Sequence, residues 1–247
     1  MQSNNDSAVT LAALQQMKRD GRKIVCIVAW DYQIAQIADR AGTDMISVGD
    51  SVGVNLWGHT SESELTLDEF LVACKAVRRG VKRALLSCDV PSHSVQAGTE
   101  AAVSAALRLV NEAGADIVKV LGTEAMVRAI VNAGVPVFAE FHGETLDATQ
   151  LAAAAKRLQD AGASLLDFRH SGPVAGPVVV NAVSIPVIGG LGGGPWLDGR
   201  VRMAHAAINY AASSIGKSGG YANVASTTLD ALVALAADVR AARQIKY

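Results

Sequence analysis

The chain has 247 residues, of which 50% are hydrophobic and 18% are charged. This balance excludes an intrinsically disordered or fibrous protein. The 22 Lys and Arg residues nearly cancel the 23 Asp and Glu residues, so no strong electrostatic field would draw the protein to nucleic acid or to an anionic membrane. Aromatic residues make up only 4%, so the core must be built from Ala, Val, Leu and Ile.

The sequence also indicates a cellular compartment. No apolar run approaches the roughly 18–20 residues that span a bilayer, and the polar segment 1–10 lacks the apolar core of a signal peptide. The three cysteines, Cys26, Cys74 and Cys88, have no metal-type spacing and are typical of small apolar side chains in a reducing compartment. We therefore expect a cytoplasmic protein with no nucleic-acid or membrane partner.

Short apolar segments rich in Val, Ile and Leu recur along the chain, and an amphipathic, Ala-rich stretch follows each of them. Such segments are typical of parallel strands that are buried on both faces. Glycines in the similar turns at 41–44, 113–116 and 161–164 stand where a helix should end before the next strand. The expected strands lie at 23–30, 44–50, 84–90, 116–122, 136–143, 164–170 and 185–190.

These segments make seven βα units of roughly 25 residues each. An eighth strand is less clear, because 201–210 fits a strand or a helix. Strict alternation predicts a parallel sheet, and about eight units favour an α/β protein with a closed (β/α)8 TIM barrel, formed by residues 1–247 as a single domain. An open doubly wound sheet is the structural alternative. We expect the last helix to pack outside the barrel or against a partner subunit.

Polar side chains stand at the carboxyl end of six consecutive expected strands. Charged residues inside apolar strands are costly unless they are paired or bound to a metal, and a parallel barrel builds its active site at these strand ends. The sequence therefore predicts a polar pocket there. Its candidate residues are Asp31 and Tyr32, Asp50 and Ser51, Asp89, Lys119, Glu140 and His142, and Asp167, Arg169 and His170.

Alternation along a strand predicts which of these side chains share a face. Because every second residue points the same way, Glu140 should lie beside His142, and Asp167 beside Arg169. His170 should point the other way unless the strand has already turned.

Two aspartates are the candidate metal ligands. Asp50 and Asp89 end neighbouring strands, so their carboxylates can converge and either share a proton or hold a divalent cation such as Mg²⁺. The alternative is that each aspartate caps the helix that follows it. The glycine-rich segment 185–196 follows strand 7, where barrels often hold a phosphate. It fits a G-x-G-x-x-G motif poorly, so we favour close backbone packing there.

Through these residues and the stretches around them, the chain resembles the ketopantoate hydroxymethyltransferase family of the phosphoenolpyruvate mutase/isocitrate lyase superfamily. The resemblance implies a barrel enzyme that transfers a hydroxymethyl group from methylenetetrahydrofolate to a branched 2-oxo acid, with Mg²⁺ stabilising the enolate. It also implies a homo-oligomer, because related barrels assemble into rings. The matching stretches, in family order, are 29–59, 66–80, 85–91, 113–122, 185–193 and 198–205.

The resemblance assigns roles residue by residue. Asp50 in VGDS and Asp89 in CDVP match metal-site residues. Ser51 and Lys119 match positions that hold the substrate carboxylate, and Tyr32 matches a position near the metal.

Two departures from the family pattern alter the expected chemistry. Leu121 replaces the third carboxylate of the metal site, and we expect Glu140 to restore it from the next strand. Arg169 occupies the position of the family's general base, and an arginine cannot act as a base at neutral pH. We therefore expect Asp167 or His170 to supply the base.

The same departures bear on the substrate. Arg169 in the pocket suggests a second anionic group on the substrate, and His142 is a further candidate for substrate binding. The sequence thus predicts a metal-dependent carbon–carbon bond enzyme of the hydroxymethyltransferase or aldolase type, with folate or formaldehyde as the one-carbon donor. The alternatives are a lyase or mutase of the isocitrate lyase or phosphoenolpyruvate mutase kind, and a non-catalytic ligand-binding barrel.

Overall fold

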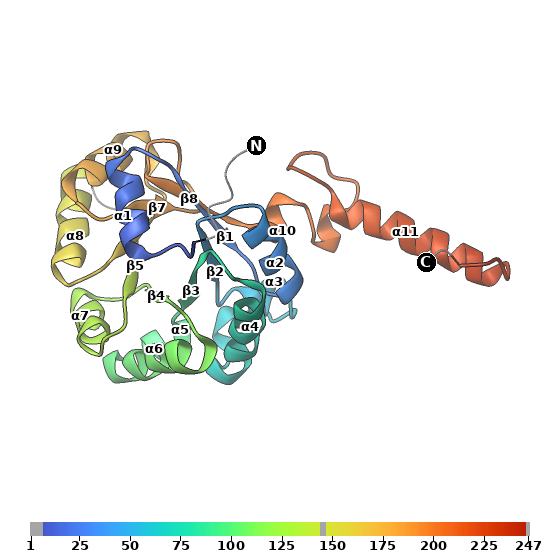
Figure 1. Cartoon of the computed structure of the whole chain (residues 1–247), viewed down its shortest axis with the longest axis horizontal. Coiled ribbons are helices and arrows are strands. Elements are labelled where there is room, and N and C mark those ends of the chain that lie inside the picture. Colours follow the sequence, from blue (N-terminus) through green and yellow to red (C-terminus); the bar gives the residue numbers. More distant parts are fainter. Residues whose placement is uncertain (1–6, 144–146, 246–247) are drawn as a thin grey trace. The chain divides into compact units, whose positions relative to one another are not determined.

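The computed structural model describes residues 7–143 and 147–245. The chain divides into two compact units between Val201 and Arg202. Eight parallel strands follow one another in chain order and close into a barrel (Figure 1), which confirms the predicted (β/α)8 fold and excludes the open sheet. The strands are β1 (Ile24–Val28), β2 (Met45–Val48), β3 (Leu85–Asp89), β4 (Ile117–Val120), β5 (Val137–His142), β6 (Leu165–Arg169), β7 (Val187–Gly189) and β8 (Gly199–Met203).

Helices connect the strands and lie around the barrel. Several begin where the sequence offers a polar cap: Thr66 accepts from the backbone N–H of Glu69, and Asp31 accepts from that of Ile34 at 2.9 Å. The helices of the first unit are α1 (Leu11–Arg19), α2 (Tyr32–Arg40), α3 (Val52–Asn55), the 3-10 turn η1 (Glu62–Glu64), α4 (Leu67–Gly80), α5 (Ser92–Gln96), α6 (Thr99–Ala113), α7 (Glu124–Asn132), α8 (Ala148–Asp160) and α9 (Gly172–Ala182).

The closing strand begins earlier than the sequence suggests. β8 starts at Gly199, and a short helix, α10 (Ala204–Ala207), follows it at once. The segment 201–210 is therefore part strand and part helix. A side chain at Gly199 would overlap the carbonyl oxygen of Ile24, so β8 approaches β1 closely because this residue has none.

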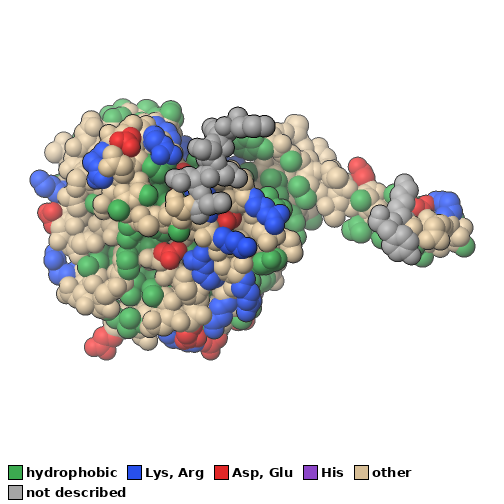
Figure 2. Space-filling view, viewed as in Figure 1, with side chains coloured by type: hydrophobic (Ala, Val, Ile, Leu, Met, Phe, Trp, Pro, Cys, Tyr) green, Lys and Arg blue, Asp and Glu red, His purple; other side chains and the backbone are tan. Residues whose placement is uncertain are grey.

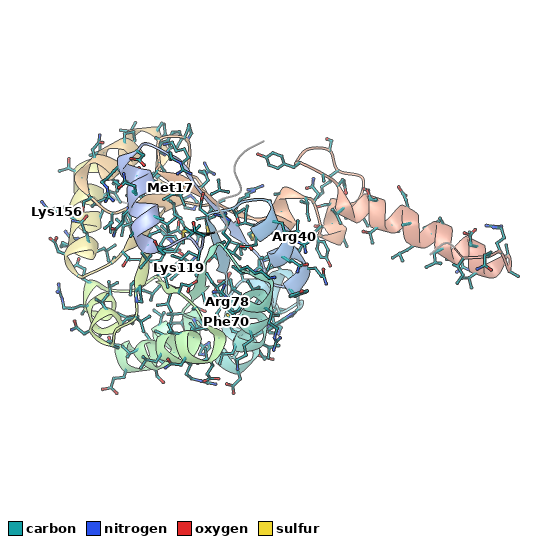
Figure 3. All side chains as sticks on the ribbon, viewed as in Figure 1. Met17, Arg40, Phe70, Arg78, Lys119 and Lys156 are labelled. Atoms are coloured by element: carbon teal, nitrogen blue, oxygen red, sulfur yellow. The ribbon has the colours of Figure 1, made fainter. Side chains whose placement is uncertain are left out.

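The inside of the barrel is apolar at the amino ends of its strands. Leu14 and Met17 of α1 pack into this end (Figure 3). The side chains that face them form a continuous buried layer. Strand β1 contributes two of these side chains, and each of β2 to β7 contributes one. This layer contains Ile24, Cys26, Met45, Leu85, Ile117, Phe138, Leu165 and Ile188. Cys26, Cys74 and Cys88 are all free and buried.

The second unit contains α10, the 3-10 turn η2 (Ala212–Ser214) and α11 (Val224–Arg240). Asn223 caps α11 by accepting from the backbone N–H of Ser226 at 2.9 Å. The prediction that this last helix packs outside the barrel or on a partner subunit stays a prediction. Its exposed large apolar residues are Leu229, Leu232, Val233, Leu235 and Val239.

The surface of the first unit carries charges of both signs. Figure 2 shows Lys and Arg side chains on the same face as Asp and Glu side chains, so neither sign covers that face. Within the two described ranges, none of the helices combines the length and the hydropathy that crossing a membrane requires.

Candidate active site at the carboxyl ends of the strands

Strand register brings the charged residues together. Asp89 of β3 pairs with Lys119 of β4, and Glu140 of β5 pairs with Asp167 of β6. Because alternate residues point the same way, these side chains project into the barrel two positions above Ser87, Ile117, Phe138 and Leu165. A charged layer therefore lies directly on the apolar layer.

Lys119 is the centre of this charged cluster. Its Nζ lies 3.1 Å from Asp89 Oδ2, 3.1 Å from Glu140 Oε2 and 3.6 Å from Asp167 Oδ2. Figure 3 places Lys119 within the ring of strands, whereas Lys156 lies on the outer side of α8. Burial lowers the pKa of the Lys119 ammonium, but the three carboxylates outweigh it and hold that pKa well above its usual value. Lys119 is thus a fixed cation.

Glu140 links the inner cation to two outer basic residues. Its Oε1 lies 2.9 Å from His142 Nε2 and accepts from Arg169 Nη1 at 2.9 Å, while its Oε2 meets Lys119. Burial opposes ionisation of Glu140, but Lys119, His142 and Arg169 outweigh it and lower its pKa to about 2. Both oxygens of Glu140 therefore interact with basic side chains of the protein.

The other buried carboxyls have the opposite shift. Burial, together with the charges of Asp50 and Glu140, raises the pKa of Asp89 to about 8, although Lys119 opposes the shift. Burial also raises the pKa of Asp167 and of Asp50, again against the effect of Lys119. One oxygen of Asp89 and one of Asp167 are buried and have no hydrogen-bond partner among the described residues. Such atoms are costly in a folded protein unless a ligand or a proton satisfies them.

Asp50 lies at the rim of the same cluster. Its Oδ2 accepts from the backbone N–H of Ser92 at 3.2 Å, and the helix that follows it directly, α3, has no side-chain cap. Asp50 therefore does not cap its own following helix. In Asp89, the carboxylate meets Lys119, and it is Asp50 that binds the first backbone N–H of α5, the helix that follows Asp89.

Gly49 leaves room between these residues. A Cβ atom at Gly49 would lie 3.1 Å from Ser51 Oγ and 3.6 Å from Asp89 Oδ2. A hydroxyl and a carboxylate thus border one small space at the end of β2. Within the described part of the chain, no three His, Cys, Asp or Glu side chains are grouped so as to hold a metal ion.

The structure places the remaining candidates farther out. The Tyr32 hydroxyl accepts from Gln36 Nε2 at 3.1 Å, one helical turn away, rather than from the charged cluster. His170 follows β6 with a φ of 52°, so the strand has already turned there, and its ring centroid lies 6.3 Å from that of His142. Leu121 is 52% exposed.

Glu62 is a charged neighbour that the sequence analysis missed. It begins η1. The negative charges of Glu62, Glu140 and Asp167 together raise the pKa of Arg169, although burial lowers it. Burial and the charge of Asp50 raise the pKa of Glu62 itself. The motif around Glu62 is the Ser61–Glu64 capping box of η1, which indicates a helical turn and no active-site position, so only the fold brings Glu62 to the strand ends.

Comparison with known proteins decides the family. The family model described as ketopantoate hydroxymethyltransferase matches residues 8–244. The chain belongs to this family. It is 36% identical over 244 residues to 3-methyl-2-oxobutanoate hydroxymethyltransferase of Cyanothece sp., covering 91% of this chain and 93% of the relative. It is 39% identical over 218 residues to the enzyme of that name from Moorella thermoacetica, covering 81% of each chain. The predicted family is confirmed.

Two solved structures share the fold of this family member. Phosphonopyruvate hydrolase in complex with oxalate and Mg²⁺ matches with a TM-score of 0.64 at 14% identity, over 93% of this chain and 86% of that one. The 2,3-dimethylmalate lyase, a phosphoenolpyruvate mutase/isocitrate lyase superfamily member, matches with a TM-score of 0.64 at 10% identity, over 93% and 87%. At these identities the likeness concerns the barrel itself.

Proposed function

We propose that this protein is a divalent-metal-dependent enzyme that makes or breaks a carbon–carbon bond beside the 2-oxo group of a 2-oxo acid, through the enolate. Membership of the ketopantoate hydroxymethyltransferase family supports the reaction type. The observation that carries the proposal is Asp89: it is buried at the strand ends, and one oxygen has no hydrogen-bond partner among the described residues.

The charges of the cluster fit a divalent cation. Four carboxyl groups face two cationic side chains: the acids are Asp50, Asp89, Glu140 and Asp167, and the bases are Lys119 and Arg169. The pKa is raised in three of the acids, Asp50, Asp89 and Asp167, so a bound cation would stabilise their ionised form. Hard carboxylate oxygens are ligands that suit Mg²⁺. A small space beside Gly49 adjoins Asp89.

Asp50 and Asp89 are the residues that would hold the ion. Glu140, which the sequence offered as a third ligand, is committed to Lys119, His142 and Arg169, and we assign it to positioning them. The ion would act as a Lewis acid that acidifies the C–H bond beside the 2-oxo group. Mg²⁺ keeps several exchangeable waters when two carboxylates hold it.

The side chains of the protein supply binding and proton transfer. The Ser51 hydroxyl and the Lys119 ammonium would hold the carboxylate of the 2-oxo acid. Asp167 would take the proton at Oδ1, which is buried and has no hydrogen-bond partner among the described residues, and burial raises its pKa towards the range in which a base works best. Arg169 remains protonated and cannot perform this step.

Three further elements complete the proposal. Methylenetetrahydrofolate would supply the one-carbon unit and the chain would form a homo-oligomer, as the family resemblance implies. The protein would work in the cytoplasm, which its free, buried cysteines suit. The alternative one-carbon donor is formaldehyde. Analysis of the products formed with each compound shows which of the two the protein uses.

Proton exchange tests the proposal directly. In D₂O with Mg²⁺, the protein should catalyse deuterium uptake beside the 2-oxo group of at least one 2-oxo acid, as followed by NMR. Asp89→Asn should abolish Mg²⁺ binding and with it the uptake, and Asp167→Asn should abolish uptake without abolishing Mg²⁺ binding. Asp160→Asn, at an exposed position in α8, is the matched control and should be unchanged. Absence of uptake with every 2-oxo acid tested, with metal present, would overturn the proposal and favour a non-catalytic barrel.

A further inference from the structure

We propose that Arg169 forms a second anion-binding subsite, so that the substrate is a 2-oxo acid with a second acidic group, a short 2-oxo diacid. This inference rests on the proposed function for the 2-oxo end of the substrate. It adds the chemistry of the other end.

The first support is the position of Arg169. It is the last residue of β6, and its side chain is 36% exposed, whereas the Lys119 side chain is 16% exposed. Arg169 is thus the outer cation of the cluster and Lys119 the inner one. A ligand that reaches Lys119 through the open end of the barrel passes Arg169.

The second support is the hydrogen bonding of Arg169. Its Nη1 donates to Glu140 Oε1 at 2.9 Å, and this is the only hydrogen bond that its guanidinium makes to a described residue. A guanidinium has five N–H donors, so most of these donors have no partner among the described residues. Their planar fork matches a carboxylate with two parallel hydrogen bonds, which an ammonium cannot provide.

The third support is the surroundings of the guanidinium. Arg169 and His142 share the single oxygen Glu140 Oε1, so two basic side chains divide one acceptor. Two further acids act on the guanidinium: Asp167, which is buried beside Lys119, and Glu62, which lies in the exposed turn η1. Glu140 therefore fixes the direction of Arg169 and leaves its outer donors accessible.

The spacing of the two cations limits the ligand. Lys119 meets one oxygen of Glu140 and Arg169 meets the other, at 3.1 and 2.9 Å. Because one carboxylate separates them, Nζ and Nη1 are at most about 8 Å apart. The carboxyl carbons of a four- or five-carbon diacid are about 4–5 Å apart when extended, so such a ligand would contact both nitrogens by lying alongside the line that joins them.

Paired ligands of equal length test the subsite. Oxaloacetate is compared with 2-oxobutanoate, and 2-oxoglutarate with 2-oxopentanoate, by isothermal titration with Mg²⁺ and by deuterium uptake. In at least one pair the diacid should bind about 10- to 100-fold more tightly, the value of a charge-assisted contact. Arg169→Gln should remove this preference, so that the diacid and the monoacid of a pair bind within about twofold of each other, and Arg169→Lys should restore part of it.

Two results would overturn the inference. One is a preference for the monoacid, or no preference, in both pairs. The other is a diacid preference that Arg169→Gln leaves unchanged, which would make Arg169 a structural partner of Glu140 only. If neither ligand of a pair undergoes deuterium uptake but the diacid preference is present and depends on Arg169, the subsite stands while the proposed function fails. Thermal unfolding of each variant confirms that the barrel is intact.

Discussion

Replacing Lys119 tests how much of the fold depends on the charged cluster. Lys119→Met removes the cation that three buried carboxylates share at 3.1–3.6 Å. Breaking a buried ion pair by removing one partner costs about 3–5 kcal/mol, because the remaining charge is left uncompensated. We expect the free energy of unfolding at pH 8 to fall by that amount. The cost should be smaller at lower pH.

The sign of the pH effect follows from linkage. Without Lys119, burial raises the pKa values of Asp89 and Asp167 in the folded state still further above those in the unfolded chain. Between the two sets of values the unfolded state binds fewer protons, so stability falls as the pH rises. The cost of Lys119→Met should therefore be small near pH 4 and largest near pH 8.

Denaturant unfolding from pH 5 to 8, with a chelator present, measures this difference. Lys156→Met, in the exposed outer side of α8, is the matched control and should change stability by less than about 0.5 kcal/mol. A cost for Lys119→Met below about 1 kcal/mol, or one that is equal at pH 5 and pH 8, would refute the reasoning.

Three further predictions concern single residues. Glu140→Gln should cost about 3 kcal/mol above pH 5; since the folded pKa of Glu140 is lowered to about 2, this difference should vanish as the pH falls from 4.5 to 2, and a constant difference in denaturant unfolding would contradict it. Gly49→Ala should keep the fold but weaken binding of a 2-oxo acid by about tenfold, the value of one hydrogen bond, because its Cβ would lie 3.1 Å from Ser51 Oγ, which would hold the substrate carboxylate; unchanged titration heats with the 2-oxo acid would count against this role of Ser51. Leu14→Ala should cost about 2–5 kcal/mol, because it leaves a cavity in the apolar layer, while Mg²⁺ binding by the folded protein stays unchanged; a cost under 1 kcal/mol would show that α1 does not close the barrel.

The sequence predicted most of the strand-end cluster because strand alternation and barrel topology determine it. Once β3 to β6 are parallel neighbours, Asp89, Lys119, Glu140 and Asp167 must project into one layer. Their contacts follow from the register of neighbouring strands, in which Asp89 pairs with Lys119, and Glu140 pairs with Asp167. Lys119 itself pairs with Phe138, two residues before Glu140.

The rest depends on loops and close approaches, which periodicity does not encode. Glu62 reaches the cluster through the conformation of a polar loop. The start of β8 depends on how closely Gly199 approaches Ile24, a packing requirement that no local pattern reveals. The engagement of both Glu140 oxygens also follows from the fold, since β6 brings Arg169 beside β5.

The position of α1 limits how ligands and protons reach the charged cluster. Leu14 and Met17 fill the amino end of the barrel, so water, protons, ions and organic ligands all reach Lys119 and Asp167 by one shared route. A ligand held at Arg169 would obstruct that route. The proton taken from such a ligand would then stay with the protein until the obstruction is removed, and could be returned to the same molecule before it is lost to solvent.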